Sequence, residues 1–264
     1  MLDWNPALYL RFASERTRPA AELLARVPLA HARHAVDLGC GPGNSTELLV
    51  QRFAGAQVTG IDNSQAMLAT ARQQLPQARF ALADIAEWAP AAGDPAPDLI
   101  YANAALQWVG AHETLIPRLF AQLAPGGVLA IQMPDNREEP SHRLMREVAG
   151  LPPFAPHIGD AAKLRTDLLN IGRYYDLLAA PRARAASVDV WHTVYQHPME
   201  SAAAIVQWLR GTGLKPFVEG LPEALQADFL AEYERRVDAA YGVRADGRRL
   251  LAFPRLFIVA QRQP

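Results

Sequence analysis

Five short apolar runs alternate with segments of helical periodicity between residues 34 and 134. The runs lie at residues 34–38, 57–62, 79–85, 98–103 and 128–133, and each predicts a buried strand. Apolar residues recur at helical spacing over 45–53, 64–75 and 112–123. Continuous apolar strands separated by helices are typical of a parallel sheet that is covered on both faces. This stretch therefore predicts an α/β fold with a doubly wound, mostly parallel sheet.

The pattern differs at both ends of the chain. Residues 1–30 predict a helical arm with a break at Pro19. After residue 134 we expect helices at 141–149, 172–178, 201–211 and 221–241, with strands at 186–195 and 253–260. The predicted parts are an arm over 1–30, a core over 31–140, and a remainder over 141–264 with a helical insertion at about 198–250.

Three glycines, Gly39, Gly41 and Gly43, follow the first predicted strand. A dinucleotide-binding loop needs the spacing G-x-G-x-x-G, in which the last glycine lets the helix pack closely while its N-terminus holds a pyrophosphate. Here the third glycine comes one residue early and Pro42 draws the loop in, which leaves little room for two phosphates. Such a loop suits a ligand without phosphate, for example the amino-acid end of S-adenosylmethionine.

Polar residues stand at or near the carboxyl ends of the first four predicted strands. They are Asp37, Asp62, Asp84 and Asn103. Open α/β sheets bind ligands at these strand ends, and an acid about 20 residues past the glycines is where such folds hold a ribose diol. We therefore expect Asp62 to accept hydrogen bonds from both ribose hydroxyls. Any one of these residues alone would more simply be a helix cap, but four in register indicate a site.

These segments resemble the successive motifs of class I S-adenosylmethionine-dependent methyltransferases. The motifs are Asp37–Gly43, Gly60–Asp62, Ala83–Ile85 and Leu123–Gly127. The resemblance implies a seven-stranded, mostly parallel Rossmann-like sheet and S-adenosylmethionine as cofactor. In that superfamily a short hairpin normally joins the last two strands, so the helical insertion here is expected to cap the substrate above the sheet edge.

Further segments resemble the family of bacterial trans-aconitate 2-methyltransferases. They are Trp4–Tyr9, Glu15–Ala20, Asn103–Trp108, Gln132–Asn136 and Leu251–Ala260, so the similarity runs nearly end to end. This resemblance implies transfer of a methyl group from S-adenosylmethionine to one carboxylate of trans-aconitate, which gives a monomethyl ester and S-adenosylhomocysteine. The substrate rests on the resemblance, because spacing and composition do not indicate it.

The expected cofactor contacts are Asp37, Gly39, Gly41, Gly43, Asp62, Asn63, Met67, Asp84, Ile85 and Asn103. Asp84 is expected at the adenine amine, and Ile85 is expected to offer a backbone donor to the ring.

The chemistry of a carboxylate acceptor asks little of the protein. A carboxylate with a pKa near 4 is already ionised at pH 7, so no general base is needed. The protein must position the reacting atoms and pair the two remaining carboxylates, which guanidinium groups do bidentately. The expected substrate contacts are Tyr9, Arg16, Arg18, Gln107, Asn136, Arg137, Tyr174, Arg210 and Arg255, with Tyr9, Arg16, Gln107 and Trp108 as positioning residues.

Composition limits the partners. A formal net charge of −1 predicts no broad basic face and argues against a nucleic-acid partner. No apolar run approaches the roughly 20 residues of a membrane span, and we expect no signal peptide in the first residues. Cys40 is the single cysteine, and the histidines are scattered, so we expect no disulfide and no metal. A small-molecule partner in the cytoplasm is expected, and the sequence does not indicate an oligomeric state.

Two alternatives stay open. The first is a methyltransferase that acts on another small acid, or on an oxygen, nitrogen or carbon nucleophile. A proton-bearing acceptor would need a base, for which His142 is the nearest candidate. The second is a non-catalytic S-adenosylmethionine-binding module, which would need the same cofactor residues. A pH–rate profile distinguishes a proton-bearing acceptor from a carboxylate acceptor. Methyl transfer to any acceptor excludes the non-catalytic module.

Overall fold

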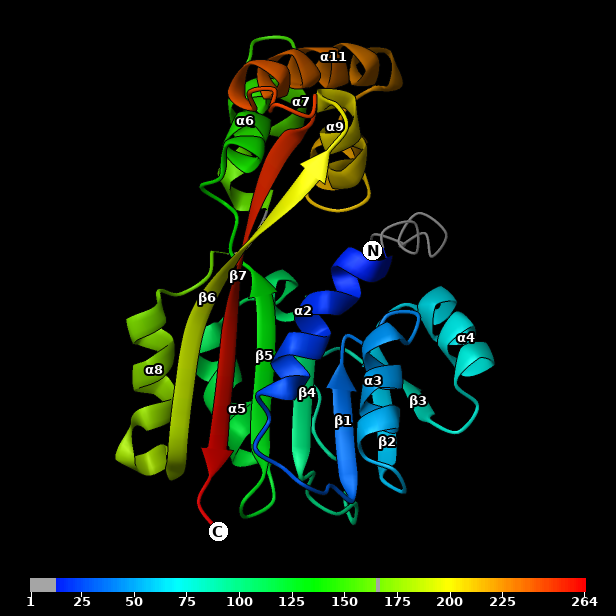
Figure 1. Ribbon diagram of the computed structural model, residues 1–264, viewed down its shortest axis with the longest axis vertical. Coiled ribbons are helices and arrows are strands. Elements are labelled where there is room, and N and C mark those ends of the chain that lie inside the picture. Colours follow the sequence, from blue (N-terminus) through cyan, green and yellow to red (C-terminus); the bar gives the residue numbers. More distant parts are fainter. Residues whose placement is uncertain (1–12, 165–166) are drawn as a thin grey trace. The chain divides into compact units, whose positions relative to one another are not determined.

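The computed structural model describes residues 13–164 and 167–264 (Figure 1). Its seven-stranded sheet has the order β3-β2-β1-β4-β5-β7-β6. The strands are β1 (His34–Leu38), β2 (Gln57–Asp62), β3 (Arg79–Leu82), β4 (Leu99–Asn103), β5 (Val128–Pro134), β6 (Ala185–Met199) and β7 (Arg249–Arg262). Strands β1 to β5 pair in parallel, and β7 runs opposite to β5 and β6 (Figure 1). The predicted doubly wound α/β sheet is confirmed.

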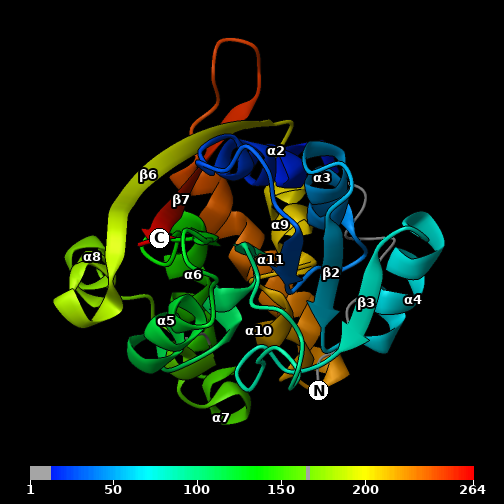
Figure 2. The same cartoon turned by 90° about the horizontal axis from the view of Figure 1, so that it is seen from below.

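The helices before β6 are α2 (Ala13–Ala25), α3 (Asn44–Arg52), α4 (Gln65–Gln74), α5 (His112–Ala121), α6 (Pro140–Ala149), α7 (Ala155–Ile158) and α8 (Ile171–Ala179). Those between β6 and β7 are α9 (Ala202–Arg210), α10 (Lys215–Glu219) and α11 (Glu223–Ala240). The described residues also form short 3-10 turns, which are η1 (Leu106–Trp108), η2 (Ala161–Leu164) and η3 (Pro181–Ala183). Figure 2 shows helices on both faces of the sheet, with α2 and α3 on one and α5 on the other.

The described chain divides into two compact units. The first unit comprises residues up to Met133 with Asp167–His192 and Leu256–Pro264, and the second comprises Pro134–Thr166 with Thr193–Arg255. Strands β6 and β7 are 15 and 14 residues long and contribute residues to both units. The first unit contains most of the sheet, and its core is built from buried aliphatic residues of β4 and β5, such as Ile100 and Ile131, with Leu119 of α5.

The strands expected at 186–195 and 253–260 are longer than predicted, and two further predictions were wrong. The third strand ends at Leu82 and not at 85, because the Asp84 carboxylate accepts from the backbone N–H of Ala86 at 2.9 Å and turns the chain. The first described helix runs through Pro19 and is not broken there. A proline removes one helical hydrogen bond, but this helix buries Ala20, Leu23 and Leu24 in the core, which offsets the loss.

Among residues 13–164 and 167–264, no helix combines the length and the apolar character that crossing a bilayer requires.

Candidate functional site

The glycine loop between β1 and α3 is fixed by close packing and by its backbone conformation. Gly39 has φ +72°, and a Cβ added there would lie 2.3 Å from the Cβ of Ala105, so a side chain does not fit. Gly41 has φ +55° but faces open space, because an added Cβ would meet nothing within 4 Å. The loop therefore packs tightly on one side against Ala105, which follows β4, and is open on the other side at Gly41.

Asp37 supports this loop from inside the first unit. Its side chain is fully buried, and Oδ2 accepts hydrogen bonds from the hydroxyls of Ser45 and Thr46, both at 2.7 Å. Burial raises the pKa of Asp37 from 3.8 to about 6, although the two hydroxyl bonds lower it in part. Asp37 thus ties β1 to the first turn of α3, and it lies behind the loop without an exposed surface.

Asp62 connects the end of β2 to the same loop. Its Oδ2 accepts from the backbone N–H of Gly41 at 2.9 Å, and its Oδ1 accepts from the backbone N–H of Ser64 at 2.8 Å. The residue is half-buried, and a carboxylate can accept more than two hydrogen bonds. Asp62 is therefore oriented by two backbone donors and still has acceptor capacity toward a ligand.

A small hollow lies beside the loop, within the first unit. It is lined by Thr17, Ala20, Gly39, Cys40, Pro42, Asn44, Ser45 and Asn103. The side-chain oxygens Oδ1 of Asn44 and Asn103 are buried and have no hydrogen-bond partner among the described residues. Buried acceptors without a partner are costly, so these two oxygens indicate a ligand that brings donors. The ammonium group of the amino-acid end of S-adenosylmethionine has three such donors, and the residues present fit it.

The other expected cofactor residues lie around this region with different exposure. Ile85 is half-buried, and its Cδ1 would lie 3.3 Å from a Cβ on Gly39, which places it against the loop. Met67 is buried, and its N–H donates to the Oγ of Ser64, the N-cap of α4, at 3.4 Å. Asn63 and Asp84 are exposed. Both residues lie just beyond the carboxyl ends of β2 and β3, where their side chains are accessible to a ligand.

The segment after β4 carries backbone strain. Ala104 and Ala111 are non-glycine residues with φ +53° and +56°, and they flank η1. The Nε2 of Gln107 donates to the carbonyl of Ala104 at 2.7 Å, while its buried Oε1 has no partner among the described residues. Strained conformations of this kind cost about 1–3 kcal/mol and concentrate at functional sites. Trp108 is 37% exposed in the same turn.

A buried histidine holds this turn in place. His112 at the start of α5 contacts the hydroxyl of Tyr174 through Nδ1 at 2.6 Å and the carbonyl of Leu106 through Nε2 at 2.9 Å. Burial lowers the pKa of His112, so the ring is neutral, with Nε2–H donating to Leu106 and Nδ1 accepting from Tyr174. Tyr174 is itself fully buried in the core of the first unit. This packing gives its ring no surface for a substrate, so we leave Tyr174 out of the proposed acceptor site.

The predicted arginines and Asn136 are divided between the two units and differ in their exposure to solvent. Arg18 pairs with Glu22 at 2.7 Å on the exposed side of α2, with 67% of its side chain accessible. In the second unit, Arg210 ends α9 and is exposed, whereas Asn136 is buried. Arg255 is buried too, and its guanidinium carbon lies 4.8 Å from the ring centre of Phe253.

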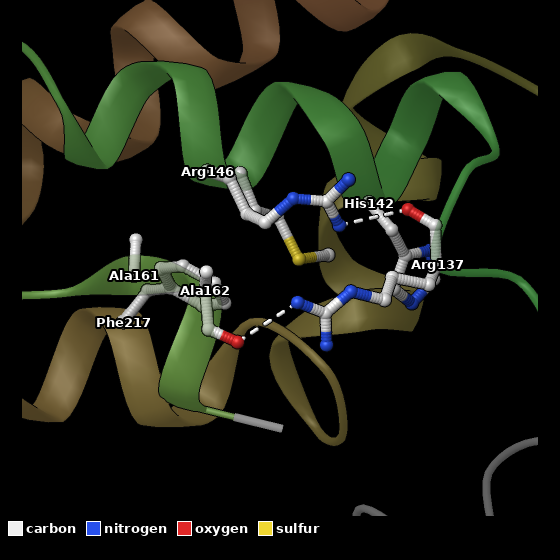
Figure 3. Close-up of a pocket in the computed structure, with 7 residues that line it drawn as sticks. Arg137, His142, Arg146, Ala161, Ala162 and Phe217 are labelled. Carbon is white, nitrogen blue, oxygen red and sulfur yellow. Dashed lines mark hydrogen bonds between the residues drawn. The ribbon is translucent and has the colours of Figure 1, made fainter. Parts of the chain in front are cut away.

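Arg137, also in the second unit, lines a hollow beside α6 (Figure 3). Tyr9 and the side chain of Arg16 lie outside the described residues.

Several residues of these two hollows were not predicted. Thr17 and Ala20 lie in the segment Glu15–Ala20 that carries the family resemblance, but their residue types do not indicate a ligand. Asn44 follows Gly43 directly and opens α3, a position from which a polar side chain reaches a loop ligand. Arg146 lies one helical turn after His142 on α6, which is a signal that helical spacing could have given.

Within the described part of the chain, no three His, Cys, Asp or Glu side chains are grouped so that they could hold a metal ion.

The comparisons with known proteins agree on one class of enzyme. Residues 35–127 match the family of methyltransferase domains. A trans-aconitate 2-methyltransferase from Delftia acidovorans is 82% identical over the whole of both chains, and one from Variovorax paradoxus is 73% identical, again over both whole chains. One from Yersinia pestis is 55% identical with the same full coverage.

Solved structures resemble this chain in fold. The YcgJ protein of Bacillus subtilis has a TM-score of 0.59 at 12% identity and covers 94% of this chain and 99% of its own. The phosphoethanolamine N-methyltransferase 2 of Haemonchus contortus, solved with S-adenosyl-L-methionine, has a TM-score of 0.54 at 17% identity and covers 94% of this chain and 53% of its own. At such identities the structures show a shared fold alone.

Proposed function

Because this chain belongs to the trans-aconitate 2-methyltransferase family, we propose that it transfers a methyl group from S-adenosylmethionine to a carboxylate of trans-aconitate. The products are the monomethyl ester and S-adenosylhomocysteine. The observation that carries the substrate assignment is 82% identity over the whole of both chains, which covers the second unit as fully as the first.

The first unit supplies the cofactor site in this proposal. S-adenosylmethionine brings a methyl group on a positively charged sulfur, which a nucleophile can displace. Asn44 and Asn103 accept from its ammonium group, and Asp62 accepts from its ribose hydroxyls. Asp84 accepts from the adenine amine, and the backbone N–H of Ile85 donates to the adenine ring. Gly41 leaves the loop open for the ligand, since no atom lies within 4 Å of a Cβ added there.

The protein's part in the reaction is orientation and charge pairing. The acceptor carboxylate is ionised at neutral pH and needs no base. Holding it in line with the methyl group supplies up to about 7–11 kcal/mol of barrier reduction. Gln107 and Trp108 serve as positioning residues of the first unit, and the strained turn that carries them is held rigid by His112.

The remaining acceptor contacts are proposed in two places. The second unit offers Asn136, Arg137, Arg210 and Arg255 to the carboxylates that do not react, and it serves as the substrate-binding part of the enzyme. The N-terminal segment offers Tyr9, Arg16 and Arg18. The partner is thus a small tricarboxylate, with neither nucleic acid nor membrane involved, and the place of action is the cytoplasm.

Mass spectrometry of products tests the proposal. The purified protein is incubated with S-adenosylmethionine and, separately, trans-aconitate, cis-aconitate, citrate, succinate and a phenol. A product 14 mass units heavier, formed fastest from trans-aconitate, is expected. Faster turnover of the phenol, or no methylated acid at all, would contradict the assignment.

The pH dependence of the chemical step tests the absence of a base. Single-turnover rates at saturating acceptor should be flat from about pH 6.5 to 9, because the nucleophile is already ionised. A rising limb through pH 7 would instead favour a proton-bearing acceptor and a catalytic base such as His142.

A further inference from the structure

One guanidinium group links α5 to the turn that follows β3. The Nη1 of Arg118 donates to the carbonyl of Trp88 at 2.5 Å. Its Nη2 donates to the carbonyls of Ala86 and Ile85 at 2.6 and 3.3 Å. A basic residue in the last turn of a helix commonly interacts with that helix's own terminal carbonyls. Arg118 lies in the last turn of α5 but bonds to a segment 30 to 33 residues away, within the first unit.

The turn over residues 84–88 is also bonded within itself. The Oδ1 of Asp84 accepts from the N–H of Ala86 at 2.9 Å, and the carbonyl of Asp84 accepts from the N–H of Glu87 at 3.2 Å. Within the described part of the chain, no hydrogen bond occupies the N–H of Ile85 or the Oδ2 of Asp84. These are the donor and the acceptor that the proposed function gives to the adenine.

Arg118 completes the hydrogen bonding of the two peptide groups in the middle of this turn. The peptide group between Ile85 and Ala86 has its N–H on the Asp84 carboxylate and its carbonyl on Arg118. The next peptide group has its N–H on the carbonyl of Asp84 and its own carbonyl on Arg118. Without the guanidinium group, both peptide groups could rotate. Their rotation would move the N–H that orients the Asp84 carboxylate.

Apolar contacts place the same turn beside the glycine loop. Ile85 and Trp88 are half-buried and pack against the core of the first unit. The Cδ1 of Ile85 would lie 3.3 Å from a Cβ on Gly39, so the turn borders the loop proposed for the cofactor. A change in the conformation of the turn would therefore reach the cofactor site.

We propose that Arg118 is a positioning residue for the adenine of S-adenosylmethionine. It holds turn 84–88 in the conformation that directs the Asp84 carboxylate and the Ile85 N–H toward the ring. A guanidinium group suits this task, because its planar set of donors bonds several carbonyls at fixed angles. The proposal rests on the proposed placement of the adenine at Asp84 and Ile85. The competing explanation is that the three hydrogen bonds only stabilise the fold.

Two ligands that differ in the base test the proposal. Calorimetry compares S-adenosylhomocysteine with its inosine analogue, in which hypoxanthine replaces adenine. The analogue has an oxygen in place of the amine and a hydrogen on the neighbouring ring nitrogen, so it should gain little from Asp84 and Ile85. In Arg118→Gln, S-adenosylhomocysteine should bind roughly five- to tenfold more weakly, because the competent conformation of the turn becomes a minor population. The preference for adenine over hypoxanthine should shrink by a similar factor.

Arg52 supplies the matched control. Its Nη2 donates to the carbonyls of Val27 and Leu29 at 3.0 and 3.3 Å, so it too holds loop carbonyls with one guanidinium group. This loop precedes β1 and is remote in sequence from turn 84–88. Arg52→Gln should lower the melting temperature while the preference for adenine stays that of the wild type. An equal loss of preference in both variants would reduce the role of Arg118 to stability.

Coupling to Asp84 gives a second measurement. Asp84→Ala removes the acceptor for the adenine amine. Adding Arg118→Gln to this variant should cost less affinity for S-adenosylhomocysteine than it costs in the wild type, because the contact that Arg118 supports is already lost. Fully additive losses would show that Arg118 acts independently of Asp84 and would overturn the proposal.

The remaining outcomes separate this proposal from the reaction. If Arg118→Gln does not fold, Arg118→Lys decides, because an ammonium group lacks the planar fork that spans the three carbonyls. A smaller loss of the adenine preference would support the proposal, and an unchanged preference would overturn it. A wild type that binds both ligands equally would refute the adenine placement and the role of Arg118 together. Binding of S-adenosylhomocysteine needs no acceptor, so failure to methylate trans-aconitate would refute the proposed reaction alone.

Discussion

At the scale of single residues, Asp62 is the side chain on which the proposed cofactor site is expected to depend most. Its carboxylate accepts a hydrogen bond from the backbone N–H of Gly41, and we propose that it also accepts from the ribose hydroxyls. Asp62→Ala should weaken S-adenosylmethionine binding by about 1.5–3 kcal/mol, because a charged acceptor is lost. Calorimetry measures this, with the exposed Asp94→Ala as the control. Wild-type affinity in Asp62→Ala would refute the ribose assignment.

Asp37 makes a second prediction at this scale, on stability against pH. Its folded pKa of about 6 lies above 3.8, so between these values the native state binds more protons than the unfolded state. The free energy of unfolding should therefore fall as pH rises from about 4 to 6, by up to about 3 kcal/mol from this group, and stay lower above pH 6.

Urea unfolding of wild type and Asp37→Asn at pH 4.5, 5.5, 6.5 and 7.5 measures this contribution. The stability of the variant relative to wild type should rise with pH, because asparagine cannot ionise in the buried site. A constant difference over the series would show that Asp37 titrates at the same pH in both states.

At the scale of elements, η1 is held by a side chain from a distant helix. The hydroxyl of Tyr174 on α8 fixes the ring of His112, which in turn holds the carbonyl of Leu106. Tyr174→Phe should cost about 1–2 kcal/mol of stability. It should also raise the Michaelis constant for trans-aconitate severalfold, because the turn that carries Gln107 loosens.

The neighbouring Tyr175 is the matched control, since its side chain is 49% exposed on the same helix. Kinetics well below the melting temperature separate positioning from simple destabilisation. An unchanged Michaelis constant in a folded Tyr174→Phe would reduce the contact to packing alone.

At the scale of the whole molecule, the two units should respond to different ligands. A ligand at 100 times its dissociation constant stabilises its site by about 2.7 kcal/mol. In hydrogen exchange followed by mass spectrometry, S-adenosylhomocysteine should protect residues 39–46 and 62–64. Trans-aconitate added afterwards should protect the segments that contain Asn136, Arg137, Arg210 and Arg255. Protection of the first set by both ligands, with none in the second, would contradict an acceptor site in the second unit.

Local signals in the sequence determined the sheet, and they predicted the loop that we propose as the cofactor loop. The apolar runs predicted the strands, and the glycine spacing with Asp62 and Asn103 predicted a ligand at their carboxyl ends. These features are readable because strand burial and loop geometry constrain residues that are near one another in the chain. The end-to-end resemblance to one family of enzymes gave the substrate, which no local pattern encodes.

The tertiary structure decided what depends on residues far apart in sequence. It joined Pro134–Thr166 to Thr193–Arg255 in one unit and brought Arg146 beside Arg137 and Phe217. It also shows that Tyr174 is buried and that its hydroxyl is hydrogen-bonded to the ring of His112, 62 residues away. A side chain's role in these cases is set by burial and by its hydrogen-bond partner. Neither follows from residue type or spacing, because long-range packing determines both.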